Sequence, residues 1–283
     1  MPVPHERRLF REVRDTVRTH GLLAPGDRVM VALSGGKDSY TLLDLLDRLR
    51  PTLSFDVTFI GVHLDQGQPG YDGRPLVEWL EARGGHWEVL SEDTYTPVTE
   101  RLSASDTYCS MCSRLRRGVL YTAAERLGCS KIALGHHRDD ALETFLMNLF
   151  FSGKLQAMPA RYRTNCDRFD VIRPLISSEE HRIAEYAAAR AFPILPCNLC
   201  GSQPGLKRDA MADLLVELES RFPHVRSVMF NALGNVRASH LLDPQLAAVW
   251  ADRPADVRPD PGPTERAQHA RALPVIQSAE RPD

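Results

Sequence analysis

The stretch VMVALSGGKDSYTLLDLL, residues 29–46, decides the fold. It begins with a short apolar run that predicts a strand buried on both faces. Leucines then recur at helical spacing from Leu42 to Leu49, which predicts a helix with one face packed against the core. Between strand and helix lies the loop Ser34-Gly35-Gly36-Lys37-Asp38-Ser39. This strand–loop–helix unit is the starting point for the rest of the chain.

The loop has the composition of an anion site. Adjacent glycines let the backbone turn sharply and present its N–H groups to an anion, toward which the helix N-terminus directs partial positive charge. Lys37 adds a cation and Ser39 a hydroxyl, whereas Asp38 repels phosphate unless a cation such as Mg²⁺ lies between them. The spacing differs from the Walker pattern of kinases and GTPases. It resembles the PP-loop of the ATP pyrophosphatases, which bind the pyrophosphate of ATP and transfer AMP; the alternative is an ordinary strand–turn–helix corner.

Composition indicates a globular protein of the cytosol. The chain has 283 residues, of which 43% are hydrophobic, so it can bury a full core. Its formal net charge of −2 shows no global nucleic-acid signature, so RNA contacts require local basic patches. We expect no membrane segment, because no apolar run reaches about 18 residues, and no signal peptide, because MPVPHERRLF lacks an apolar core. Because the cytoplasm is reducing, we expect the six cysteines to be free thiols or metal ligands and not disulfides.

Strand and helix patterns alternate along most of the chain. Strands are predicted at residues 29–33, 55–64, 86–90, 131–134 and 169–175, and helices at 5–20, 76–83, 115–127, 141–151 and 178–191, the last capped by Ser177 or Ser178. This alternation predicts an α/β fold with a doubly wound, mainly parallel sheet and helical additions. We expect an N-terminal helical segment (1–28), a nucleotide-binding domain (29–192), a cysteine knuckle with a helical extension (193–252) and a disordered tail (253–283).

A second polar motif, GHHRDD at residues 135–140, also lies between a predicted strand and a helix. Two such corners in one parallel sheet can face each other, and His63 ends a further strand at the same edge. Asp139 or Asp140 could then join Asp38 in binding Mg²⁺, which prefers few carboxylates together with phosphate oxygens. The alternative is that both acids only cap the helix. His136 and His137 could neutralise phosphate charge or simply pack.

The cysteines form two CxxC pairs. They are Cys109 with Cys112 and Cys197 with Cys200, while Cys129 and Cys166 are interpreted as structural. Two pairs in a cytosolic protein indicate a metal site. Spacing leaves three alternatives open, which are a structural zinc, an iron–sulfur cluster and a redox or persulfide-carrying thiol pair.

Four segments together resemble the tRNA-cytidine(32) 2-sulfurtransferases over roughly residues 5 to 245. The segments are VMVALSGGKDSYTLLDLL, YCSMCSRLRRG, ALGHHRDDALETFLMNLFFSGKL and FPILPCNLCGSQP. The resemblance implies the adenine nucleotide alpha hydrolase-like (PP-loop) fold and a 4Fe-4S cluster held by three cysteines. Carried over, the cluster ligands are Cys109, Cys112 and Cys200, with Cys197 as the other candidate for the third. For ATP, the resemblance implies the loop residues together with His63, Gly135 and Asp140. It implies Asp38 and Asp140 as ligands of Mg²⁺, and Lys37 and Asp38 as catalytic residues.

The resemblance also implies the reaction and the partners. We expect transfer of AMP to O2 of cytidine-32 in tRNA, followed by replacement of that oxygen by sulfur, which a cysteine desulfurase supplies to a homodimeric enzyme. Apart from the resemblance, basic residues beside the first cysteine pair, Arg114, Arg116 and Arg117, are candidates for contacts with RNA, as are the arginines of residues 5–20. The alternative for both groups is an ordinary solvated surface. The competing hypotheses are another PP-loop tRNA-modifying synthetase, which needs no cluster, and a zinc-stabilised RNA-binding module.

Overall fold

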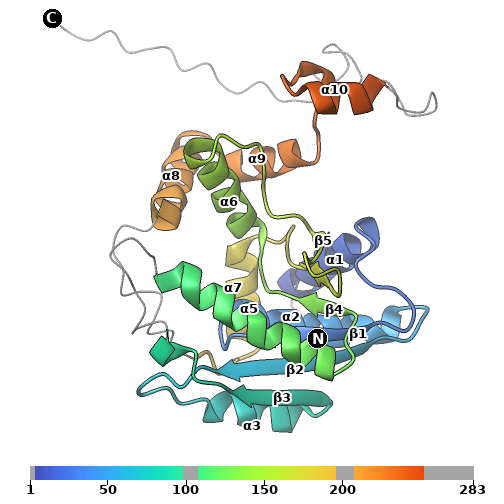
Figure 1. Cartoon of the computed structure of the whole chain (residues 1–283), viewed down its shortest axis with the longest axis vertical. Coiled ribbons are helices and arrows are strands. Elements are labelled where there is room, and N and C mark those ends of the chain that lie inside the picture. Colours follow the sequence, from blue (N-terminus) through green and yellow to red (C-terminus); the bar gives the residue numbers. More distant parts are fainter. Residues whose placement is uncertain (1–3, 98–107, 196–206, 252–283) are drawn as a thin grey trace, which may run out of the picture. The chain divides into compact units, whose positions relative to one another are not determined.

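The computed structural model describes residues 4–97, 108–195 and 207–251 (Figure 1). In this part of the chain six strands form a sheet in the order β3-β2-β1-β4-β6-β5. They are β1 (Arg28–Leu33), β2 (Thr58–Asp65), β3 (His86–Ser91), β4 (Lys131–Ala133), β5 (Arg161–Arg163) and β6 (Asp170–Ile172). All neighbours pair in parallel except β5 and β6, which are antiparallel.

Helices connect the strands and extend the chain beyond the sheet. They are α1 (Pro4–Thr19), α2 (Lys37–Leu49), α3 (Arg74–Arg83), α5 (Tyr108–Arg126), α6 (Arg138–Phe151), α7 (Glu180–Ala189), α8 (Lys207–Arg221), α9 (Val225–Leu233) and α10 (Pro244–Ala251), with the short 3₁₀ helices η1 (Arg50–Thr52) and η2 (Ala238–His240).

Helices cover both faces of the sheet because its central strands are apolar on both. In β1, Val29 and Val31 belong to a core cluster with the buried leucines of α1, α2 and α3 and with Ile183 of α7. Met30, on the opposite face of the same strand, belongs to a second cluster with Ala123 of α5. Figure 1 shows α5 in front of the sheet. The prediction of a doubly wound, mainly parallel α/β fold is confirmed.

Strand order determines where a ligand site can form. From β1 the chain proceeds outward through β2 to β3 and then returns to β4 on the other side of β1. The order therefore reverses between β1 and β4, and the crevice at the carboxyl ends of such strands is the usual ligand site of an open α/β sheet. The loop after β1 and the GHHRDD segment after β4 both lie at this edge.

Two details differ from the sequence analysis. Strand β5 was not predicted, because three residues with two exposed arginines have no apolar pattern and depend on pairing with β6. The predicted N-cap of α7 is wrong, since Glu179 occupies that position and Ser178 is fully buried. A carboxylate from α6 does the capping instead, because Asp139 accepts a hydrogen bond of 3.0 Å from the backbone N–H of Glu180.

Contacts divide the chain into two compact units, Met1–Ala212 and Asp213–Asp283. The first contains the whole sheet, while the described part of the second contains most of α8 together with α9 and α10. The domain boundaries expected from the sequence stay predictions, and the tail at 253–283 lies outside the described residues. Within the described ranges, no helix combines the length and the apolar character that crossing a bilayer requires.

Stability should depend on the leucines of α2 that bind it to the sheet. Leu46 is 0% exposed, so Leu46→Ala should lower the free energy of unfolding by about 2–5 kcal/mol through lost burial and a cavity. Leu155→Ala is the matched control, because Leu155 is 65% exposed and its truncation should change stability by less than about 0.5 kcal/mol. Urea unfolding checks both variants, and equal losses would contradict this account of the core.

Candidate functional site

The loop between β1 and α2 is held in shape by its own serines. Ser39 is buried, and its hydroxyl donates to the carbonyl of Gly36 at 2.9 Å and accepts from the backbone N–H of Ser34 at 3.2 Å. Ser34 Oγ in turn accepts from the N–H of Gly36 at 3.3 Å. These serines therefore shape the loop, and helix α2 begins immediately afterwards at Lys37, where its first N–H groups lack helical partners.

Gly35 is the point where a distant segment meets the loop. It has a φ of +80°, and a Cβ there would lie 2.9 Å from Leu195 Cδ1. Its carbonyl accepts a 2.9 Å hydrogen bond from the N–H of Leu195, and Tyr40 Oη donates to the carbonyl of Pro193 at 3.0 Å. Glycine is thus required both by conformation and by close approach. The chain that leads into Cys197 and Cys200 starts on this loop.

The second corner packs directly against the first. A Cβ on Gly135 would lie 3.2 Å from the backbone carbonyl carbon of Asp38, so only glycine permits this approach without displacement. His137 follows as the N-cap of α6, and its N–H donates to Asp140 Oδ2 at 2.9 Å. The expectation that the two corners face each other is therefore met by their contact.

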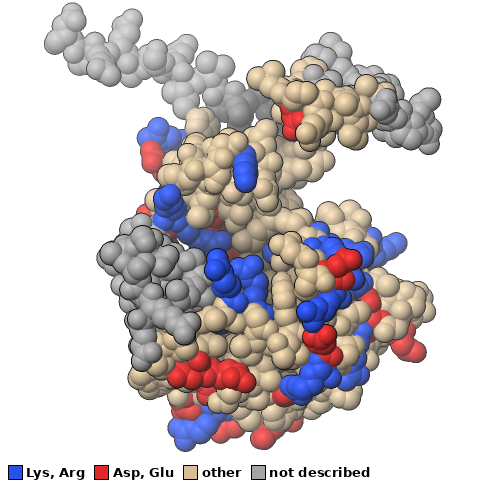
Figure 2. All heavy atoms as spheres, viewed as in Figure 1, with Lys and Arg blue, Asp and Glu red and all other residues tan. Residues whose placement is uncertain are grey.

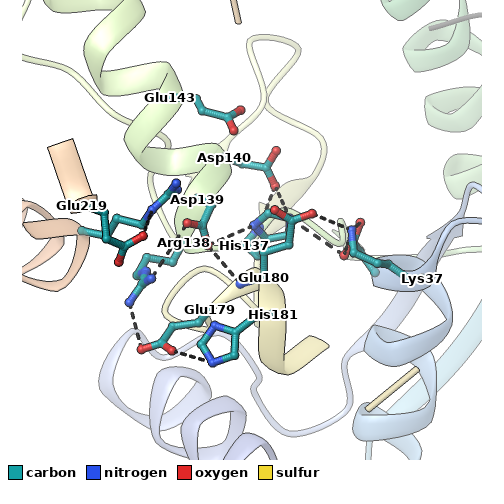
Figure 3. A network of polar contacts seen from close by, with 12 residues as sticks. Lys37, His137, Arg138, Asp139, Asp140, Glu143, Glu179, Glu180, His181 and Glu219 are labelled. Atoms are coloured by element: carbon teal, nitrogen blue, oxygen red, sulfur yellow. Dashed lines mark hydrogen bonds and ion pairs between the residues drawn. The ribbon is translucent and has the colours of Figure 1, made fainter. Parts of the chain in front are cut away.

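Two carboxylates converge on Nε2 of one imidazole between these corners, while Asp139 Oδ2 lies 4.0 Å from its other ring nitrogen, Nδ1. His137 Nε2 lies 3.5 Å from Asp140 Oδ2 and 3.9 Å from Asp38 Oδ1 (Figure 3). Oδ1 of Asp38 is buried and accepts no hydrogen bond within the described residues. Burial raises the pKa of Asp38, although the charges of Lys37 and His137 oppose this rise. An oxygen-rich site, in which one buried carboxylate oxygen has an ion pair with Lys37 but no hydrogen bond from the described residues, suits a hard divalent cation such as Mg²⁺.

Lys37 bridges α2 and the start of α7. Its Nζ lies 2.9 Å from Glu180 Oε1 and 3.2 Å from Asp38 Oδ1. Burial favours the neutral amine, but the hydrogen bond to Glu180 and the charge of Asp38 outweigh it and raise the pKa of Lys37. The lysine therefore stays cationic at the mouth of the loop, where a phosphate could replace the carboxylates as its partner.

The two acids of GHHRDD have different roles. Asp139 is 4% exposed and its Oδ2 caps α7. Asp140 is less buried and faces the same imidazole nitrogen, Nε2, as Asp38, whereas Asp139 faces Nδ1. The geometry thus favours Asp140 over Asp139 as the partner of Asp38. The neighbouring His136 stays neutral at pH 7, because burial lowers its pKa to about 4.

His63 lies at the expected edge of the sheet, but its polar atoms are engaged. Its Nδ1 lies 2.8 Å from the carbonyl of Leu33 and its Nε2 lies 2.5 Å from Tyr71 Oη. Burial lowers its pKa, which the bond to Leu33 only partly offsets. The ring lines a hollow of about 330 Å³ together with Asp65 and Arg74. Its assignment to ATP binding stays a prediction.

Sequence reasoning missed two charged residues of this site, Glu143 and Arg208. Arg208, in the first turn of α8, places Nη1 3.5 Å from Asp140 Oδ1 and Nε 3.4 Å from Glu143 Oε2. Burial raises the pKa of Glu143 to about 7, although Arg208 opposes the shift. Glu143 has helical spacing from Asp140, so it could have been inferred from the motif, but no local pattern connects Arg208 to it. Arg208 ties the chain that follows the second cysteine pair to α6.

The predicted cysteine ligands are only partly within the described structure. Cys109 and Cys112 lie in the first turns of α5, with side chains outside the described set, and Cys197 and Cys200 lie outside the described residues. Cys129 is buried, which raises the pKa of its thiol, and Cys166 is exposed. The structure therefore locates both ends of the segment with the second pair, through Leu195 on the loop and Arg208 on α6.

Gly35 should be sensitive to substitution for two separable reasons. Gly35→Ala should destabilise the fold, because φ is positive, and should also weaken ATP binding, because the new Cβ displaces Leu195 or the loop. Gly26→Ala is the matched control, since Gly26 has a φ of +77° but nothing within 4 Å of its added Cβ. Urea unfolding and equilibrium ATP binding measure the two effects. Unchanged ATP affinity in Gly35→Ala would show that the contact with Leu195 does not shape the nucleotide site.

Comparison with known proteins identifies the family. A family model described as a PP-loop domain matches residues 6–193. The tRNA-cytidine(32) 2-sulfurtransferase of Cytophaga hutchinsonii is 48% identical over 249 residues, which cover 87% of either chain. The protein of that name from Sorangium cellulosum is 49% identical over 237 residues, 84% of either chain.

A solved structure supports the fold. The U34-tRNA thiolase NcsA from Methanococcus maripaludis with its 4Fe-4S cluster matches with a TM-score of 0.65 and 22% identity, covering 83% of this chain and 80% of that one. At this identity the likeness concerns architecture alone. The family match and the two close relatives carry the assignment: the chain belongs to the tRNA-cytidine(32) 2-sulfurtransferases, enzymes built on a PP-loop domain.

Proposed function

We propose that this protein converts cytidine-32 of tRNA to 2-thiocytidine, by adenylation of the base O2 and transfer of sulfur at an iron–sulfur cluster. The observation that carries the proposal is the meeting of two strand–helix corners, at which Asp38 and Asp140 face one imidazole beside a glycine loop and a cationic lysine. Family membership supplies the substrate class, since the relatives are named as tRNA-cytidine(32) 2-sulfurtransferases. ATP is the co-substrate that a PP-loop domain implies.

The site is suited to the first step, in which an oxygen is made a good leaving group. O2 of the base attacks the α-phosphorus of ATP, and the bond from this phosphorus to the bridging oxygen breaks to release pyrophosphate. The backbone of Gly35 and Gly36, the N-terminus of α2 and Lys37 stabilise the negative charge of the departing pyrophosphate. Asp38 and Asp140 would hold Mg²⁺, which supplies charge neutralisation on the phosphate oxygens when bound.

The second step replaces the adenylated oxygen. A sulfur nucleophile attacks C2 of the base, and AMP leaves with the former base oxygen. Cys109, Cys112 and Cys200 would hold a 4Fe-4S cluster, with Cys197 as the other candidate, and a cluster with one iron free of protein ligands supplies a binding place for sulfide. Support comes from the position of Cys109 and Cys112 at the start of α5 and from Leu195, which starts the second cysteine segment at Gly35.

Further parts of the proposal concern partners. A cysteine desulfurase would supply the sulfur, the enzyme would act as a homodimer, and both would be cytoplasmic. The RNA surface would include Arg114, Arg116 and Arg117, of which the first and last are exposed on α5. Figure 2 shows a group of basic side chains over the N-terminal half of this helix.

Asp38 should act on the reaction more than on ground-state binding. Asp38→Asn keeps the size of the side chain but removes its charge, so it should lower the rate of pyrophosphate release by a larger factor than it weakens ATP affinity, and should raise the Mg²⁺ requirement. Single-turnover pyrophosphate release with unmodified tRNA across a Mg²⁺ titration measures this. Asp15→Asn, at a carboxylate that is 59% exposed in α1, is the control. Release of ADP and phosphate would exclude an adenylating enzyme.

The cysteines should separate into ligands and bystanders. Cys109→Ala, Cys112→Ala and Cys200→Ala should each abolish thiolation and most bound iron, because each removes a thiolate ligand. Cys129→Ala and Cys166→Ala are the controls and should keep both. Iron, sulfide and zinc analysis after anaerobic purification provides the measurement, with 2-thiocytidine counted by mass spectrometry of digested tRNA. Stoichiometric zinc without iron would contradict the cluster, and iron loss in Cys197→Ala but not Cys200→Ala would reassign the third ligand.

A further inference from the structure

A basic hollow lies away from the catalytic edge, between α1 and the C-terminal half of α2. It has a volume of about 440 Å³ and is lined by Arg7, Phe10, Arg11 and Arg48. Helix α2 starts at the glycine loop, and Arg48 lies 11 residues beyond Lys37, so the hollow is about 16 Å along the helix from the loop. It is therefore a different surface from the ATP site, although both belong to the same compact unit.

Two arginines of α1 reach this hollow without carboxylate partners. Arg7 and Arg11 are one helical turn apart, and Arg11 Nε donates to the backbone carbonyl of Arg7 at 3.3 Å. Among the described residues, no carboxylate forms an ion pair with either guanidinium. Like charges at this spacing repel each other, so the helix incurs a cost that a bound anion would remove.

Two other arginines of the same helix are paired locally. Arg8 lies 3.2 Å from Glu12, a carboxylate that it shares with Arg182, and Arg14 pairs with Asp15 at 2.9 Å. Arg18, in the last turn, forms no ion pair with a described residue. On the face drawn in Figure 2, basic and acidic side chains are interspersed. Local pairing therefore distinguishes the cations of this helix, and two of its arginines that lack a described carboxylate partner, Arg7 and Arg11, line the hollow.

The third guanidinium is held in position by aromatic rings. Arg48 Nη1 donates to Tyr186 Oη at 2.6 Å, and its Cζ lies 5.8 Å from the ring centre of Phe10 and 5.9 Å from that of Tyr186. Asp44, one turn earlier in α2, is occupied by Arg190 at 2.8 Å and by the hydroxyl of Tyr186. The carboxylate with helical spacing from Arg48 is thus already neutralised, and Arg48 keeps donors for an external acceptor.

We infer that Arg7, Arg11 and Arg48 form a binding site for RNA phosphodiesters, which contacts tRNA away from the reacting nucleotide. Guanidinium groups bind phosphate oxygens through paired, charge-assisted hydrogen bonds, and phosphate contacts position a nucleic acid without reading its sequence. Three cations from two helices line one hollow and so offer concentrated positive charge to a polyanion. This inference rests on the proposed function for the identity of the RNA, and it adds a second contact surface to that function.

The test compares two double variants of one helix that remove the same charge. Arg7→Gln/Arg11→Gln removes the unpaired arginines, whereas Arg8→Gln/Arg14→Gln removes the paired ones. Binding of unmodified tRNA is measured by fluorescence anisotropy over a range of salt concentrations. The first variant should lower the log–log salt slope by about two, roughly one for each lost phosphate contact, and the second should leave it near the wild-type value.

Further readouts separate the alternatives. ATP affinity and the urea midpoint should match the wild type in both variants, and Arg48→Gln should lower the slope by about one. Equal loss of slope in the two double variants would show that only net charge matters and would overturn the site. An unchanged slope in Arg7→Gln/Arg11→Gln would also overturn the site. If the oligomeric state of that variant changed, the hollow would be a protein contact; if it did not, the hollow would have no binding role. Failure of the wild type to bind tRNA would instead overturn the proposed function.

Discussion

The approach of Gly135 to the backbone of Asp38 is the constraint on which the rest of this site depends. The two corners meet so closely that a Cβ on Gly135 would lie 3.2 Å from the carbonyl carbon of Asp38. This contact brings Asp140 and Asp38 to one imidazole and leaves one carboxylate oxygen buried without a hydrogen bond from the described residues. The charge of Lys37, 3.2 Å away, balances this oxygen, and a bound cation would add to that balance.

Charges from remote segments complete this centre. Glu180 of α7 and Arg208 of α8 approach it from the chain on either side of the second cysteine pair, and each forms an ion pair with a residue of one corner. Leu195 adds a backbone hydrogen bond to Gly35. Movement at the glycine loop is therefore linked to the ends of the cysteine segment. Such linkage would serve a reaction in which adenylation and sulfur transfer occur on one bound base.

The distribution of charge explains how a protein with a net charge of −2 can bind a polyanion. Paired arginines such as Arg8 and Arg14 contribute little to the external potential, because their partners cancel them nearby. Arg7 and Arg11 differ in forming no ion pair with a described residue, and Asp44, one turn before Arg48, is engaged by Arg190. At the proposed site, affinity for RNA would depend on local pairing and fall with salt, while the acidic residues would limit non-specific binding.

The sequence alone determined the sheet class, the loop between β1 and α2, the GHHRDD corner and the cysteine pairs, because apolar period and glycine placement are local properties. The spacing of GHHRDD left Asp139 and Asp140 equivalent, and only the family resemblance singled out Asp140; nothing in the sequence predicted β5 or Arg208. Only the tertiary structure decided these, since they depend on contacts between residues far apart in the chain: Asp139 caps α7, β5 pairs with β6, and Arg208 reaches Asp140. The pairs of Arg8 and Arg14 are local to α1, but only the tertiary structure placed Arg7 and Arg11 beside Arg48 of α2, because that hollow joins two helices.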